Sequence, residues 1–202
     1  MADLHQAIGF FGDSGSGKTT LIERLIKRFE QDGLRVAAVK HAHHGFDIDR
    51  PGKDSYRFRA AGAAQVLIAS ERRWVLMGDE IAQDSADALR PGASAAAVEA
   101  ARLSPLARQI ARFDPCDLVL VEGYRGQAGI PFIQVRRRRD ADPADPAGAR
   151  RAVRAETVAG LVAVASDENL PDAERQGIPL LDLNDIEAIA RFIAVRLKVD
   201  LC

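Results

Sequence analysis

The stretch Gly12-Asp13-Ser14-Gly15-Ser16-Gly17-Lys18-Thr19 decides the fold expected for this chain. It fits the pattern G-x-x-x-x-G-K-[ST], a phosphate-binding loop that requires a strand before it and a helix after it. The apolar run 7–11 has the length of a short buried strand, and residues 20–29 place their apolar side chains on one helical stripe. The sequence therefore predicts the order strand, glycine-rich turn, helix that the pattern needs.

The residue types of this loop suit the binding of a polyphosphate. Glycine adopts backbone conformations that other residues avoid, so consecutive N–H groups can converge on an anion, and the following helix start adds unpaired donors. We expect Lys18 to reach the β- and γ-phosphates and to serve in catalysis, the Thr19 hydroxyl to bind Mg²⁺, and Thr20 to contact the α-phosphate. A glycine-rich turn that binds nothing is the alternative. The expected nucleotide-binding residues of the loop are Gly12, Asp13, Ser14, Gly15, Ser16, Gly17, Lys18, Thr19 and Thr20.

The composition of the chain argues against nucleic acid and membranes as partners. Its 28 basic and 29 acidic residues leave a net charge of −1, so no overall field attracts nucleic acid or a membrane surface. No apolar run approaches the length of a membrane span and no secretory signal is visible, which favours a cytoplasmic location. Cys116 and Cys202 stand too far apart to indicate a disulfide framework or a metal-ligand pair, and Cys116 is expected to be a buried small side chain.

Alternating strands and helical segments predict an α/β fold of the three-layer P-loop NTPase type, with a largely parallel sheet. Runs 65–69 and 73–77 are joined by a tight connection, which predicts a hairpin and hence an antiparallel extension. We expect residues 1–202 to form a single domain, in which about 71–92 are an inserted antiparallel strand and loop and about 137–154 a mobile loop. The other expected strands are 7–11, 34–40, 118–121, 132–136, 161–165 and 180–183.

Three helix starts carry capping signals. Asp54 is expected to cap a short helix at 55–61, and Ser104 stands before Pro105, which is favoured at the first helical position. Either Asn184 or Asp185 is expected to cap the last helix. Ligands in such folds lie beyond the carboxyl ends of the strands, and the sites discussed next all follow expected strands.

A carboxylate at a strand end is expected to complete a magnesium site. Mg²⁺ prefers oxygen ligands, and a P-loop protein supplies a carboxylate from the tip of a neighbouring strand. Glu122 follows four apolar residues, where an acidic side chain is costly unless it faces a cleft. We therefore expect Glu122 to act on the metal and in catalysis. Asp47 and Asp49 compete for a second role; we assign Asp47 to the metal and Asp49 to catalysis, against the alternative that both are turn residues.

The polar segment 41–53 offers further binding groups. His41, His43 and His44 could bind a transition metal, but no cysteine or distant histidine completes such a site, so we favour contacts of His43 and His44 with phosphate or with a partner. Lys53 and Arg57 add positive charge that could attract an anionic second substrate. A solvated basic face is the alternative for this pair.

The sequence indicates less clearly which residue recognises the base and what the run of four arginines does. Asp167 follows the expected strand 161–165, where its carboxylate could accept hydrogen bonds from the two adjacent N–H donors of guanine, or it could be a turn residue. The four arginines 136–139 are followed by acidic residues and lack interleaved aromatic residues. These neighbours favour a solvated loop over a nucleic-acid patch.

Together these motifs resemble the molybdopterin-guanine dinucleotide biosynthesis protein B family, MobB. Beyond the loop, the resemblance rests on KHAHHGFDIDRPGKDS at 40–55 with Arg57, Arg59 and AGA at 61–63, and on LVLVEGY at 118–124 with the strand after Pro131. It covers most of residues 7–136, and the last third matches in general layout. The resemblance implies a dimeric GTP-binding protein with weak GTPase activity that uses Mg²⁺. It also implies that the protein assists a partner guanylyltransferase in attaching GMP to molybdenum-bound molybdopterin, which makes molybdopterin a further candidate ligand.

The chain departs from the family pattern at Arg125 and Phe132, where lysine is usual. An anion contact through those lysines does not carry over, since arginine is only partly equivalent and phenylalanine is not equivalent at all. Two other functions stay open. A small-molecule kinase would use Asp47 or Asp49 as a base and Lys53 to bind the acceptor, and a nickel-handling GTPase chaperone would use the three histidines. Since neither a catalytic glutamine nor an arginine finger is apparent, we expect hydrolysis as slow as about 10⁻⁴ s⁻¹.

Overall fold

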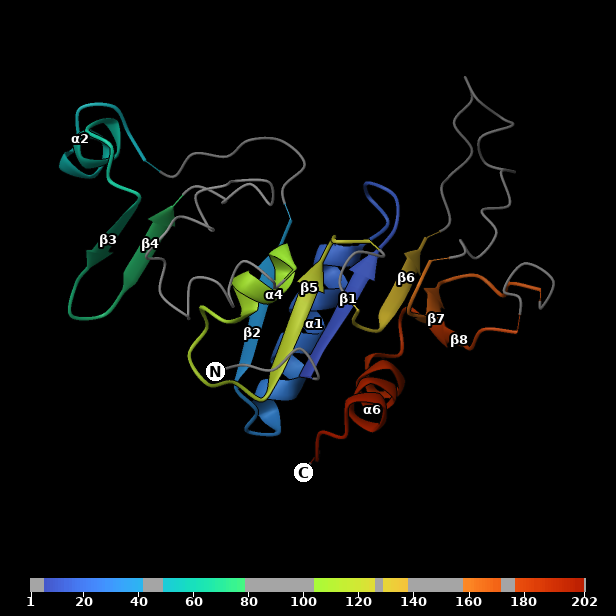
Figure 1. The fold of residues 1–202 in the computed structure, drawn as a ribbon. Helices are drawn as coiled ribbons and strands as arrows, with labels where there is room; N and C mark the ends of the chain where they lie inside the picture. The colour runs from blue at the N-terminus through green and yellow to red at the C-terminus, as the bar shows by residue number, and fades with distance from the viewer. Residues whose placement is uncertain are drawn as a thin grey trace, which may run out of the picture. The chain divides into compact units, whose positions relative to one another are not determined.

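A computed structural model describes residues 6–41, 49–78, 104–125, 129–137, 158–171 and 177–201 (Figure 1). The chain divides into two compact units. We call Met1–His41 with Leu103–Cys202 the sheet unit, and Ala42–Arg102 the hairpin unit. The expectation that residues 1–202 form one domain stays a prediction.

The sheet unit holds one parallel sheet, in which the strand order is β2-β5-β1-β6-β7-β8. The first strand, β1, is therefore central, and the ends of β5 and β6 flank the loop that follows it (Figure 1). The strands are β1 (Ala7–Phe11), β2 (Val36–Lys40), β5 (Leu118–Glu122), β6 (Phe132–Arg136), β7 (Leu161–Ser166) and β8 (Leu180–Asp182). All six match the expected strands to within about two residues, which is the usual uncertainty of element ends.

Helices cover both faces of this sheet, so the unit has three layers. Alternate residues of each strand point to opposite faces. Ile8 and Phe10 pack with α1 (Lys18–Gln31) and α6 (Ile186–Leu197) on one face, whereas Ala7 and Phe11 pack with α4 (Pro105–Ile110) on the other. Strands covered on both sides read as unbroken apolar runs, which is why sequence alone located them.

A glycine on β1 leaves room for a large aromatic ring on the neighbouring strand β6. Gly9 lies opposite Phe132 in the strand pairing, and a β-carbon on Gly9 would overlap the Phe132 ring. The missing side chain thus leaves space for a ring that is 0% exposed and meets Phe11 edge-on, with 6.1 Å between ring centroids. Phe132 is therefore a core residue.

Two of the three capping predictions are confirmed. The Ser104 side chain accepts from Ala107 N at the start of α4, and Asp185, the second of the two candidates, accepts from Ala188 N at the start of α6. The prediction for Asp54 is wrong, because α2 (Asp54–Ala60) already includes that residue and has Lys53 at its N-cap without a side-chain cap. Asp54 instead places a negative charge in the first turn, where it complements the helix dipole.

In its described residues, 49–78, the hairpin unit has α2 followed by two strands, β3 (Gln65–Ala69) and β4 (Trp74–Gly78), that pair antiparallel as expected. They form a two-stranded sheet of their own. The turn between them is fixed by the Ser70 hydroxyl, which donates to Arg73 O, while Ser70 N donates to the same carbonyl. Of the helices in the described parts of the chain, none combines the length and apolar character that crossing a bilayer requires.

Candidate functional site

The predicted phosphate-binding loop follows β1 and leads directly into α1. Its three glycines all have positive φ, at 153° for Gly12, 77° for Gly15 and 90° for Gly17, a region that side-chain-bearing residues rarely adopt. A β-carbon on Gly12 would also overlap the backbone oxygen of Val135 at the end of β6. The loop therefore needs glycine for both conformation and space, as its sequence indicated.

Lys18 points into the loop. Its ammonium group donates to Gly12 O at 3.0 Å and to Asp13 O at 2.6 Å. The Ser16 hydroxyl is buried, 7% exposed as a residue, and has no hydrogen-bond partner among the described residues. A buried hydroxyl without a partner is costly. A loop that holds a cation and an unpaired hydroxyl suits an anion with several oxygen atoms.

The first residues of α1 and the end of β5 bring two predicted metal ligands together. The Thr19 hydroxyl donates to Glu122 Oε2 at 2.9 Å, and Lys40 Nζ lies 3.6 Å from Glu122 Oε1. The strand pairing explains this contact, because Phe10 lies opposite Glu122 and β1 leads into the loop. Glu122 is largely buried, with 15% of its side chain exposed, as expected for an acid that faces the site.

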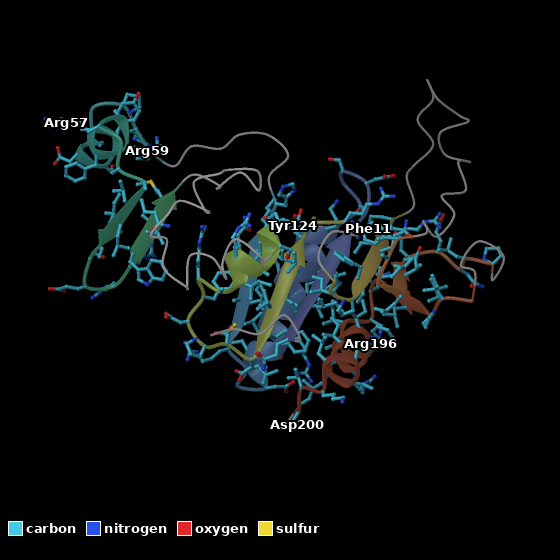
Figure 2. All side chains as sticks on the ribbon, in the orientation of Figure 1. Phe11, Arg57, Arg59, Tyr124, Arg196 and Asp200 are labelled. Carbon is cyan, nitrogen blue, oxygen red and sulfur yellow. The ribbon has the colours of Figure 1, made fainter. Side chains whose placement is uncertain are left out.

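A strained turn holds Glu122 in place. Gly123 and Tyr124 both have positive φ, 97° and 54°, and a β-carbon on Gly123 would approach His41 Cβ to 2.9 Å. His41 N donates to Glu122 O, and the His41 and Tyr124 rings lie 4.5 Å apart between centroids. Figure 2 shows Tyr124 and Phe11 near the carboxyl ends of the central strands. Strain of this kind persists only where the surroundings fix it, and it clusters at functional sites.

A feature that sequence reasoning missed lies at the ends of β6 and β7. Arg137 Nε is 3.6 Å from Asp167 Oδ2, with 50% of the arginine and 23% of the aspartate side chain exposed. Arg137 follows β6 and half of its side chain is exposed, as expected of a solvated loop, and the structure adds its ion pair with Asp167. The strand register contains the signal, because Arg136 pairs with Ser166 and the next residues must be neighbours. Most of the expected mobile loop 137–154 lies outside the described residues.

The remaining site predictions fall in the hairpin unit. Asp49 has only 3% of its side chain exposed, and its carboxylate accepts from Arg50 N, Ser55 Oγ and Arg59 Nε at 3.0, 2.8 and 3.1 Å. These contacts tie α2 to the segment before it and give a structural reason for an aspartate there. Its catalytic role stays a prediction.

Two cations of this unit with predicted roles are Lys53, at the N-cap of α2, and Arg57, in its last turn. The Arg57 side chain is 75% exposed, and its Nη1 lies 3.6 Å from Oδ1 of the exposed Asp54; Figure 2 shows Arg57 with Arg59 on α2. Roles for these cations in binding a second substrate or partner also stay predictions. Asp47, His43 and His44 lie outside the described residues.

Two further side chains of the sheet unit have contacts that the sequence did not specify. The Arg125 guanidinium lies over the Phe11 ring, 5.4 Å from its centroid, in a cation–π contact. Cys116, expected to be buried, is only partly buried; it packs against the α4 face of the sheet, and desolvation raises the pKa of its thiol. Within the described residues, no three His, Cys, Asp or Glu side chains cluster in a way that could hold a metal ion.

Comparisons with known proteins identify relatives of the whole chain. Residues 7–95 match the family described as MobB, molybdopterin guanine dinucleotide synthesis protein B. The molybdopterin-guanine dinucleotide biosynthesis adapter protein of Escherichia coli is 36% identical over 188 residues, which cover 92% of this chain and 90% of that protein. The adapter protein of the same name from Haemophilus influenzae is 36% identical over 92% of this chain and 86% of its own length.

A solved structure has the same fold. The crystal structure of Bacillus subtilis MobB superposes with a TM-score of 0.60 at 21% identity, covering 96% of this chain and 99% of that one. The identity and coverage of the two adapter proteins, together with the loop and the Glu122 turn, establish the family. The chain belongs to the MobB family.

Proposed function

We propose that this chain binds GTP with Mg²⁺ at the loop 12–19 and acts as an adaptor in molybdenum cofactor biosynthesis. In that role it assists a partner guanylyltransferase in attaching GMP to molybdopterin, in accord with the names of its relatives. The proposal includes homodimer formation and, with GTP bound, only weak hydrolysis.

One contact carries the proposal: the 2.9 Å hydrogen bond between Thr19 Oγ1 and Glu122 Oε2. Mg²⁺ binds oxygen ligands at about 2.0–2.1 Å in octahedral geometry, so adjacent ligand oxygens lie about 3 Å apart. The two oxygens already have that separation, at the N-terminus of α1, where the loop amides favour negative charge. A hydroxyl and a carboxylate are also the hard ligands that Mg²⁺ prefers. The residues present therefore fit the ion, which would neutralise phosphate charge when bound.

The chain's own groups provide the other contacts to the nucleotide. The loop amides would surround the phosphates, and the Lys18 ammonium would exchange the Gly12 and Asp13 carbonyls for phosphate oxygens. The unpaired Ser16 hydroxyl is a further donor at this position. Asp167 is our candidate for guanine recognition. A carboxylate has about four acceptor positions, so its salt bridge to Arg137 leaves capacity for the base.

Reconstitution of the guanylyltransferase reaction tests this function. Formation of molybdopterin guanine dinucleotide from molybdopterin and GTP is measured with the purified enzyme alone, with the wild-type chain, and with Lys18→Ala. We expect the wild-type chain to stimulate product formation at limiting GTP and Lys18→Ala to lose that effect. Equal stimulation by both proteins would contradict the proposal, since the adaptor role would then be independent of the loop.

A further inference from the structure

Arg137 lies beside the phosphate-binding loop, although 120 positions separate it from Gly17 in the numbering. Val135, two residues before it, contacts the start of the loop so closely that Gly12 has no room for a β-carbon. At the other end of the loop, Arg137 Nη1 is 4.0 Å from the point where a β-carbon on Gly17 would lie. Residues 135–137, at the end of β6 and just beyond it, therefore lie beside the loop from Gly12 to Gly17.

Asp167 positions this guanidinium. The ion pair joins Asp167 Oδ2 to Arg137 Nε, whereas Nη1 is the atom nearest Gly17. A guanidinium has five N–H donors in a rigid plane, so one edge can pair with the aspartate while the other faces the loop. Half of the arginine side chain is exposed, and a ligand in the loop can therefore reach it.

We propose that Arg137 is a phosphate-binding residue that contacts the β- or γ-phosphate of the nucleotide through its terminal Nη groups. This inference rests on the proposed function and adds to it a second cation, which the loop pattern does not contain. Arginine suits the role because its planar donors bind phosphate in a bidentate way, whereas lysine acts as a point charge. Asp167 is then a positioning residue for the arginine as well as a candidate for base recognition.

The proposed contact concerns the binding of the nucleotide and leaves the expectation of slow hydrolysis unchanged. Hydrolysis also requires a group that orients the attacking water. Charge-assisted hydrogen bonds contribute more than neutral ones, so loss of this contact is expected to weaken GTP binding about 10- to 100-fold.

Calorimetric titration of four proteins with GTP, GDP and GMP in the presence of Mg²⁺ tests the inference. The proteins are the wild type, Arg137→Ala, Arg137→Lys and the matched control Arg196→Ala, which removes an exposed arginine of α6 (Figure 2). We expect Arg137→Ala to lose about 10- to 100-fold in affinity for GTP and at most 2-fold for GMP. Arg137→Lys should fall in between, and Arg196→Ala should match the wild type. The GDP titration decides whether the contact reaches the β-phosphate or only the γ-phosphate.

The outcomes separate this inference from the proposed function. If the wild type binds GTP and Arg137→Ala binds it equally well, the inference is overturned and the proposed function stands. Equal losses in Arg137→Ala and Arg196→Ala would also overturn it, because net charge would then explain the effect. If the wild type binds no GTP, both are overturned. Thermal unfolding of each variant identifies any loss that comes from misfolding.

Discussion

The sheet unit and the hairpin unit differ in how deeply the elements that hold their candidate functional residues are buried. In the sheet unit, all five residues of β1 are buried, and so are the first four of β5 and of β6. In the hairpin unit, α2 buries no side chain, and Val66 is the one buried residue of its two strands. The residues of the loop 12–19 are thus positioned by tightly packed strands, whereas Asp49 is held mainly by polar contacts. Replacing a glycine or an aspartate of a loop is therefore expected to change stability by different amounts in the two units.

The largest expected effect comes from replacing one glycine in each unit by alanine. Gly12 and Gly52 both have positive φ, but a β-carbon on Gly12 would overlap Val135 O, whereas one on Gly52 would meet nothing within 4 Å. We expect Gly12→Ala to lower the free energy of unfolding by roughly 3 kcal/mol or more, since strain and overlap add. Gly52→Ala should cost about 1 kcal/mol, for strain alone. Urea denaturation followed by circular dichroism measures both, and equal losses would contradict the distinction.

The next effect concerns Asp49 in the hairpin unit. Asp49→Asn removes the charge of a carboxylate that is 3% exposed and bound to Arg59, so we expect a loss of about 2–3 kcal/mol in the stability of this unit. Trp74 is the single tryptophan of the chain and lies on β4, so its fluorescence reports unfolding of the hairpin unit.

Asp54→Asn is the matched control, because the Asp54 carboxylate is 84% exposed and such pairs contribute about 0–1 kcal/mol. An unchanged stability in Asp49→Asn, combined with lost GTP hydrolysis, would instead support the predicted catalytic role.

In the sheet unit, Glu122→Gln tests the magnesium site. The amide can still accept from the Thr19 hydroxyl, but it lacks the charge that attracts Mg²⁺. We expect Mg²⁺ to strengthen GTP binding by the wild type and to strengthen it about 10-fold less in the variant, given the worth of a charged contact. Titrations with and without Mg²⁺ measure this ratio. Glu30→Gln, on an exposed position of α1, is the control, and a Glu122→Gln protein with full Mg²⁺ dependence would remove Glu122 from the site.

The last effect, of similar size, concerns base choice. If Asp167 accepts from guanine, Asp167→Asn should reduce the preference for GTP over ATP by about 10-fold, since amide and base donors would then face each other. The ratio of the two affinities cancels any change in Arg137, because both nucleotides carry the same phosphates. A lower affinity for both with an unchanged ratio would mean that Asp167 acts only through the arginine.

Sequence predicted the local features of the sheet unit well. Apolar runs located its strands, and the structure confirms the order of strand, turn and helix around the loop and the Ser104 cap. Each of these features depends on neighbouring residues in the chain. A buried strand or a glycine at positive φ leaves its mark in the local composition.

Features that depend on strand order could not be predicted in the same way. The ion pair of Arg137 with Asp167 requires β7 to lie beside β6. Thr19 and Glu122 are both expected at the magnesium site, but their direct hydrogen bond requires β5 to lie beside β1. A single sequence does not specify which parallel strands are neighbours. The misplaced cap at Asp54 has a local cause, because an acidic residue is favoured both at the N-cap and in the first turn.

The central claim is that the amides of the loop 12–19, together with Lys18, bind a nucleoside triphosphate. Calorimetric titration of the wild type and Lys18→Ala with GTP and ATP, with and without Mg²⁺, tests it most directly. We predict stoichiometric binding that prefers GTP and depends on Mg²⁺, and a loss of about 100-fold or more in Lys18→Ala, as expected when a charged partner of the phosphates is removed. Binding of GTP by Lys18→Ala with the affinity of the wild type would contradict the claim.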